Sequence, residues 1–388
     1  MIGLFNSNIK EWQCLFNSLA LFIQQAQKED KDDLKLDDNL NWQFIGEVAQ
    51  KHRVLPFLAV MLKKDNVLDG LPEKIQTQMM LCLQQMQWQN RVKMLEFNRI
   101  QKIFQSQHVP IIPLKGVALT NLVYDQHPFR AMGDIDVLIE RDNLEKVGNL
   151  MEEHSFQWAE MINRWHTSLF RELVGRGSLL NGEVALDLQW NSQFIISGRF
   201  CSLDWNRVWV RRIPFDELGN NVFLLHPDDQ ISYLSMQILN DIEVNTPYLI
   251  QLLDLALVLT KYNVNCKDAA KIVVSHLNSF QTERAQILFL LLDECFFKLR
   301  PLETFSESSR KFLELFLTAF QKNPLSFKMP INKLIASPWR RLMFIASYFF
   351  PSRNYLKMDA STSTRQEIAT YFNYWKSLIG RVGMTIIS

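Results

Sequence analysis

Two aspartates separated by one residue, inside an otherwise apolar segment, place the strongest constraint on this chain. The segment 134–139 reads Asp-Ile-Asp-Val-Leu-Ile and follows Gly133, a pattern that predicts a β-strand beginning after a turn. Because side chains alternate along a strand, Asp134 and Asp136 are expected on the same face. Two carboxylates held that close repel each other unless a cation lies between them. The pattern favours a metal site, although surface strands also carry alternating acids without one.

The residues before this strand predict an anion site next to it. Residues 110–114 are apolar and predict a first strand, Lys115-Gly116 a turn, and residues 117–124 a helix. A helix that begins after a strand and a glycine turn presents free backbone N–H groups, which attract phosphates. Lys115 adds a full positive charge at that position, and Gly116 permits close approach of another backbone.

These residues resemble a known signature. Leu114-Lys-Gly116, Arg130 and the segment Gly133-Asp-Ile-Asp-Val-Leu138 are similar to the motif of the nucleotidyltransferase superfamily, whose fold is that of DNA polymerase β. The closest resemblance is to a bacterial branch of poorly characterised nucleotidyltransferases. It implies an α+β fold with a small mixed sheet, and transfer of a nucleoside monophosphate (NMP) from a nucleoside triphosphate (NTP), most often ATP.

The resemblance also implies roles for individual residues. Asp134 and Asp136 would be catalytic ligands of two Mg²⁺ ions, which Mn²⁺ can replace. Lys115, Gly116 and Arg130 would bind the nucleotide, with Arg130 alternatively paired to a structural carboxylate. The superfamily turn usually reads Gly-Ser or Gly-Gly, whereas Val117 follows the glycine here. Lys115 is therefore expected to replace the missing hydroxyl contact to a phosphate.

A third carboxylate is expected on a neighbouring strand. Asn181-Gly182 is a strong two-residue hairpin signal, and the strand after it is predicted over 183–190. Alternation places Asp187 and Gln189 on one face and the large apolar residues on the other. The resemblance implies that Asp187 is a metal ligand and the base for the acceptor, with Glu183 as a rival. Gln189 stands where the closer family often has histidine.

Helical patterns surround this core. Residues 1–107 predict an N-terminal helical region, 108–215 the α/β core and 216–388 a C-terminal helical domain. Within the core, Asp142 is a candidate N-cap for a helix over 142–153. Apolar residues recur at helical spacing in these segments. The predicted helices cover 8–27, 41–63, 73–107, 229–240, 247–261, 266–278, 281–298, 306–322 and 331–349. Asp254 lies in one of them, where it either faces the cleft or is a buried structural aspartate.

The composition limits which binding partners and which cellular location we expect. The 388 residues include 42 basic and 41 acidic side chains, so no global field draws the protein to nucleic acid. Five scattered cysteines without metal spacing are typical of reduced thiols, which favours a cytoplasmic protein. We find no signal peptide pattern and no apolar run of the ~18 residues that a membrane span needs. Basic and aromatic residues alternate over 338–357, which favours a core helix with solvated flanks over a membrane or RNA surface.

The acceptor stays open at this stage. A small molecule, peptide or protein is favoured over tRNA, because large RNA footprints rest on many phosphate contacts. A tRNA-directed nucleotidyltransferase toxin is the alternative. Val117 and Gln189 also motivate a catalytically inactive interaction protein that keeps the fold. A phosphotransferase on a related two-lobed scaffold is disfavoured, because the chain has no Asp-Phe-Gly segment.

Overall fold

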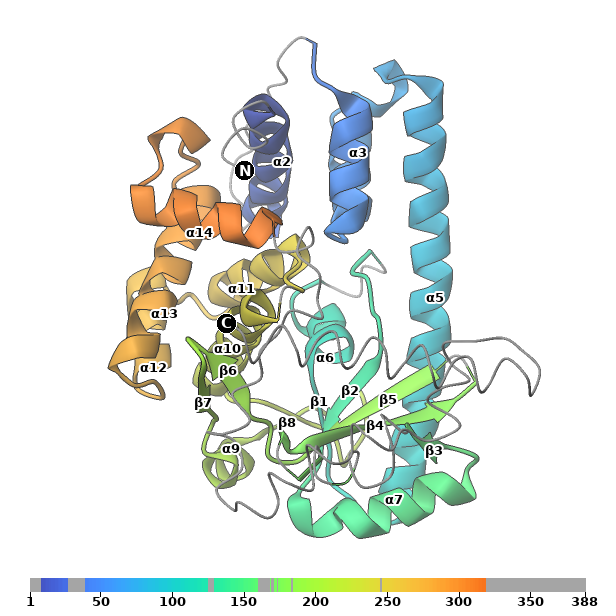
Figure 1. Cartoon of the computed structure of the whole chain (residues 1–388). Helices are drawn as coiled ribbons and strands as arrows, with labels where there is room; N and C mark the ends of the chain where they lie inside the picture. The colour runs from blue at the N-terminus through green and yellow to red at the C-terminus, as the bar shows by residue number, and fades with distance from the viewer. Residues whose placement is uncertain are drawn as a thin grey trace, which may run out of the picture.

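The architecture is α+β: helices from both ends of the described chain pack against each other, and the small mixed sheet lies below them in Figure 1. The computed structural model describes residues 8–26, 39–124, 129–159, 168, 171–172, 174–182, 184–244 and 246–318. Glu183, the helix predicted over 331–349 and the segment 338–357 lie outside the described residues.

The N-terminal part is helical, as its apolar stripes predict. Its elements are α2 (Ile9–Ala26), α3 (Trp42–Lys51), α4 (Leu55–Lys64), the 3-10 turn η1 (Leu68–Gly70) and α5 (Glu73–Ser106). The segment predicted as helical over 41–63 is helical, but the chain breaks within it, between α3 and α4. Pro56 stands in the first turn of α4, and Arg53 has a left-handed φ of 62°. Pro56 has no N–H to donate to the carbonyl four residues earlier, and its ring would clash with that carbonyl, so one continuous helix cannot run from α3 through Pro56.

Helix α5 belongs to two hydrophobic cores. Its first half buries Ile75, Met79 and Leu83 against the other N-terminal helices. Its last part buries Phe97 and other aromatic or aliphatic residues in the core beneath the sheet. The 34-residue helix has no glycine or proline inside it, so one unbroken element joins the two cores (Figure 1).

The central sheet has the strand order β1-β2-β5-β4-β3. The strands are β1 (Ile112–Pro113), β2 (Ile135–Leu138), β3 (Gln157–Trp158), β4 (Arg176–Asn181) and β5 (Val184–Gln189). Strands β2 and β5 are parallel, while the other neighbours are antiparallel. The predicted strands are confirmed within one or two residues at each end, and β3 was not predicted. The hairpin at Asn181-Gly182 is confirmed, with Asn181 paired to Val184.

Two helices follow the first two strands. After β1 comes α6 (Lys115–Leu122), which begins two residues earlier than predicted. After β2 come η2 (Arg141–Asn143) and α7 (Leu144–Glu153). The prediction that Asp142 caps this helix is wrong: Asn143 is the N-cap residue and makes no side-chain cap bond. Asp142 lies inside the 3-10 turn η2, which leads directly into α7 without a side-chain cap.

Past the core, short strands lead into a second helical group. The elements are β6 (Phe194–Ile196), β7 (Arg199–Cys201), α9 (Trp205–Arg211), β8 (Ile213–Pro214), β9 (Phe223–Leu224), α10 (Pro227–Glu243), α11 (Leu249–Lys261), α12 (Cys266–Val274), α13 (Ser279–Leu292), the π turn η3 (Asp293–Phe297), η4 (Leu302–Thr304) and α14 (Glu307–Thr318). Helix α11 is buried on almost all sides, as its sequence predicts. All five cysteines are free thiols. In the described part of the chain, none of the helices has the length and apolarity that crossing a membrane requires.

Candidate functional site

Three carboxylates meet where β2 and β5 run side by side. The parallel register places Asp136 directly beside Asp187, and Asp134 precedes β2 by one residue. One oxygen from each of Asp134, Asp136 and Asp187 lies within 4.8 Å of the others. Asp136 is buried and the other two are half-buried. The structure therefore brings together the three aspartates that the sequence predicts as metal ligands.

The electrostatics of this cluster suit a cation. Burial, together with the charges of Asp136 and Asp134, raises the pKa of Asp187 to about 7. Burial also raises the pKa of Asp136 above its usual value, although Lys115 opposes this. Burial disfavours the charged form of Asp134 too, but the charges of Lys115 and Arg53 help to hold its pKa below the usual range. A divalent ion would remove this repulsion, so the donor set fits Mg²⁺ or Mn²⁺.

Two neighbouring side chains hold Asp136 in place. Lys115 Nζ lies 2.7 Å from Asp136 Oδ1, and Gln189 Nε2 donates to the same oxygen at 3.1 Å. Gln189 Oε1 in turn accepts from Ser192 Oγ at 2.7 Å and from Tyr233 OH at 3.2 Å. The Gln189 amide therefore orients a carboxylate of the cluster. Sequence reasoning assigned no such role to Gln189.

The turn before α6 is tightly packed. Lys115 has a left-handed φ of 46°, and its side chain reaches Asp136 of β2. A Cβ at Gly116 would lie 2.7 Å from Met132 Cγ and 3.0 Å from Arg130 Nη1. The close approach that this glycine permits is thus made by the chain's own segment 130–132.

Arg130 forms a buried ion pair with Asp254, which comes from α11. Arg130 Nε donates to Asp254 Oδ1 at 2.8 Å and Nη2 to Oδ2 at 2.6 Å, and Tyr124 OH donates to Oδ1 at 2.6 Å. Helix α5 supports the same loop, because Asn90 Nδ2 donates to the Arg130 carbonyl at 2.7 Å. Arg130 and Asp254 thus form a buried ion pair, and both residues also line the cavity described next.

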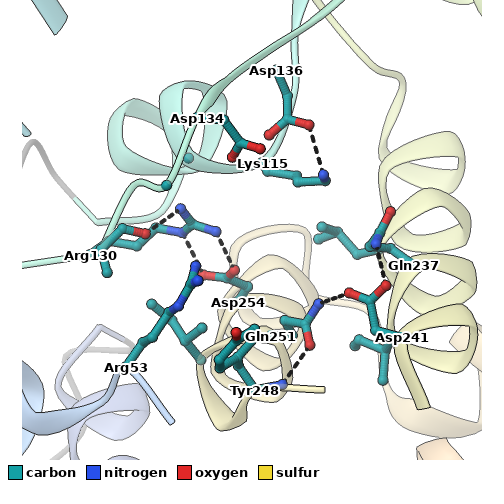
Figure 2. A pocket seen from close by; sticks show the side chains of 16 residues that line it. Arg53, Lys115, Arg130, Asp134, Asp136, Gln237, Asp241, Tyr248, Gln251 and Asp254 are labelled. Atoms are coloured by element: carbon teal, nitrogen blue, oxygen red, sulfur yellow. Dashed lines mark hydrogen bonds and ion pairs between the residues drawn. The ribbon is translucent and has the colours of Figure 1, made fainter. Parts of the chain in front are cut away.

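A cavity of about 180 Å³ opens beside the aspartates. One wall is the core, with Lys115, Gly116, Arg130, Asp134 and Asp136. The opposite wall comes from α10, α11 and the residues before α11, and Arg53 reaches in from the end of α3 (Figure 2). The cavity is therefore lined by residues of the N-terminal helices, of the α/β core and of helices α10 and α11.

The opposite wall carries an ordered polar network. Gln237 Nε2 donates to Asp241 Oδ1 and Gln251 Nε2 to Asp241 Oδ2, each at 2.7 Å. Gln251 Oε1 accepts from the backbone N–H of Tyr248 at 2.8 Å (Figure 2). Sequence reasoning missed these residues and Arg53. The available signal was weak: polar side chains inside the apolar helices 229–240 and 247–261.

Comparison with known proteins adds one match. The model of a protein family described as an uncharacterised nucleotidyltransferase matches residues 38–298. This stretch contains the whole sheet and every residue that lines the cavity. No curated protein matches the chain, and no solved structure matches it.

Proposed function

The chain belongs to this nucleotidyltransferase family and is therefore an enzyme of NMP transfer, and on that premise we propose that it transfers AMP from ATP, with Mg²⁺, to an acceptor hydroxyl. The observation that carries the proposal is the set of three carboxylate oxygens within 4.8 Å of one another. The acceptor belongs to a small molecule, a peptide or a protein.

Asp134, Asp136 and Asp187 are the residues that would hold the metal. When bound there, Mg²⁺ would supply positive charge that offsets the charge of the triphosphate and of the leaving pyrophosphate. The acceptor oxygen forms a bond to the α-phosphorus, the bond from that phosphorus to the bridging oxygen breaks, and pyrophosphate leaves. Asp187 accepts the acceptor's proton, because it is the third carboxylate of the cluster and can act as a general base there.

Lys115 and Arg130 have different parts in this proposal. Lys115 compensates the charge of Asp136 and is within reach of phosphates in the cavity that both residues line. Arg130 has two guanidinium nitrogens bonded to Asp254, so it positions the turn around Gly116. Such chemistry depends mainly on positioning and on charge stabilisation, which few residues can supply.

The alternatives are weighed by the same contacts. Gln189 supports Asp136 and is itself held by Ser192 and Tyr233, an arrangement that favours an active enzyme over an inactive interaction protein. The near-zero net charge favours a small or peptidic acceptor over tRNA. Incubating the protein with each labelled NTP, Mg²⁺ and cell extract identifies both nucleotide and acceptor.

The assignment is tested with Asp136→Asn and Asp187→Asn. Each removes a charged ligand with little change in shape, so transfer is expected to fall at least roughly a hundredfold. Mn²⁺ binding, followed by electron paramagnetic resonance without nucleotide, should weaken in the same variants. Asp142→Asn, an exposed aspartate in η2, serves as the control and should behave like the wild type. Unchanged transfer by an Asp134→Ala/Asp136→Ala double variant refutes the proposed site.

A further inference from the structure

Arg53, from the N-terminal helical part of the chain, lines the cavity described above. It follows the end of α3, and its exposed side chain lines the same space as Lys115 and Asp134 (Figure 2). A Cβ at Gly133 would lie only 3.5 Å from Arg53 Nη1. The guanidinium therefore stands beside the loop that leads into Asp134.

The cations of the cavity wall are not equivalent. Lys115 is paired with Asp136, and Arg130 is paired twice with Asp254. Among the described residues, Arg53 is the cation of this wall with no carboxylate in ion-pair range, and its contact is with the ring of Tyr248, 4.1 Å from guanidinium carbon to ring centroid. A guanidinium stacked on a ring keeps its edge N–H donors available for another ligand.

The position of Arg53 is fixed by backbone contacts on both sides. Its own N–H donates to Gln50 O at 3.0 Å, closing the end of α3. The neighbouring carbonyl, His52 O, accepts from Ile250 N of α11 at 3.4 Å. The turn that carries Arg53 is thus attached to the helix that begins after Tyr248. An arginine held in this way has less freedom to lose when it binds a ligand.

We propose that Arg53 binds the β- and γ-phosphates of the NTP and the pyrophosphate that leaves. The proposal rests on the nucleotidyl transfer proposed above. A triphosphate held at Asp134 and Asp136 would lie in the same cavity that Arg53 lines. Guanidinium binds phosphate oxygens through two parallel hydrogen bonds, which a single ammonium cannot make. The N-terminal helices therefore supply a residue of the nucleotide site.

The test compares nucleotides that differ only in their phosphates. Arg53→Gly removes the side chain, and glycine accepts the left-handed φ of 62° at this position without strain. Calorimetric titration with Mg²⁺ is expected to show NTP binding weakened by about tenfold to a hundredfold, the usual loss for a charge-assisted bond. NMP binding should be unchanged. Arg53→Lys should restore part of the affinity for NTP.

Controls separate this inference from the function on which it rests. Arg91→Ala removes an exposed arginine of α5 outside the cavity wall and should bind NTP like the wild type. Mn²⁺ binding without nucleotide should not weaken in Arg53→Gly, because the change removes a positive charge near Asp134 and no proposed metal ligand, and thermal melting confirms that the variant folds. Equal loss of NTP and NMP affinity, or wild-type NTP binding by Arg53→Gly, overturns the inference alone. Failure of the wild type to bind any NTP overturns the proposed function as well.

Discussion

At the scale of single residues, the site is built on buried groups whose protonation depends on their surroundings. Asp136 accepts from both Lys115 and Gln189, and its pKa is raised by burial even so. His52, one residue before Arg53, is buried at 2% exposure in contact with Trp12. Burial and the charge of Lys51 lower the pKa of His52 to about 3. The turn that carries Arg53 is therefore anchored by a neutral histidine.

This histidine predicts a loss of stability in mild acid. Below pH 6.5 the unfolded chain binds a proton at His52, whereas the folded protein does not until the pH approaches 3. Between those limits the free energy of unfolding should fall by about 1.4 kcal/mol per pH unit from this residue. Urea unfolding at pH 6.5 and 5.0 measures the effect. His52→Gln should flatten the dependence, while His154→Gln, an exposed control, should leave it as in the wild type. Equal slopes for all three proteins would contradict the assignment.

At the scale of elements, β5 has to keep its register for Asp187 to stand beside Asp136. Gly175 secures the start of β4 and the end of β5, because its carbonyl accepts from Trp190 N at 2.9 Å and from Asn191 N at 3.1 Å. A Cβ at Gly175 would lie 2.0 Å from Asn191 O, an overlap with backbone that cannot be relieved by side-chain rotation. At the other end of the hairpin, a Cβ at Gly182 would have no heavy atom within 4 Å.

Two glycine substitutions separate strain from overlap. Both positions have a positive φ, 63° at Gly175 and 58° at Gly182. Gly182→Ala meets nothing within 4 Å, so it should cost only the left-handed strain of about 1–2 kcal/mol. Gly175→Ala adds a backbone overlap and should cost roughly 1–3 kcal/mol more. Denaturant unfolding measures the difference, and equal losses would show that Asn191 moves away freely.

The elements also show where the sequence is informative. The strands at Asp136 and Asp187 follow from alternation and the hairpin from Asn181-Gly182, because these signals are local. The break at 52–54 is explained by Pro56 in the first turn of α4. The apolar pattern over 41–63 alone does not reveal this break. The partner of Arg130 is Asp254, 124 residues away, and no spacing rule links two residues that meet through tertiary packing. The aspartate cluster was therefore predictable, whereas the far wall of the cavity was not.

At the scale of the whole molecule, a buried ion pair connects the core to helix α11. Arg130, Asp254 and Tyr124 form a closed set in which the carboxylate accepts three hydrogen bonds. Removing one member leaves a buried charge without its partner, which is more costly than removing both. The pair therefore behaves as a unit.

A double-mutant cycle tests that unit. Arg130→Met and Asp254→Leu should each lower the free energy of unfolding by about 3–5 kcal/mol, and the double variant by clearly less than their sum. Urea unfolding of the four proteins gives the coupling energy. Additive losses would mean that the two side chains do not support each other, and that another contact joins the core to α11.

Helix α5 carries a mechanical consequence. Over 34 residues it extends for about 51 Å, and both of its ends are embedded in packed cores. A helix without proline or glycine lacks the usual kink positions, so bending within α5 is disfavoured as a way for the N-terminal helices to move relative to the sheet. Arg53 is exposed and lines the same cavity as Asp134 and Asp136, so a polyanion that enters this cavity meets the positive charge of an arginine as well as the aspartates.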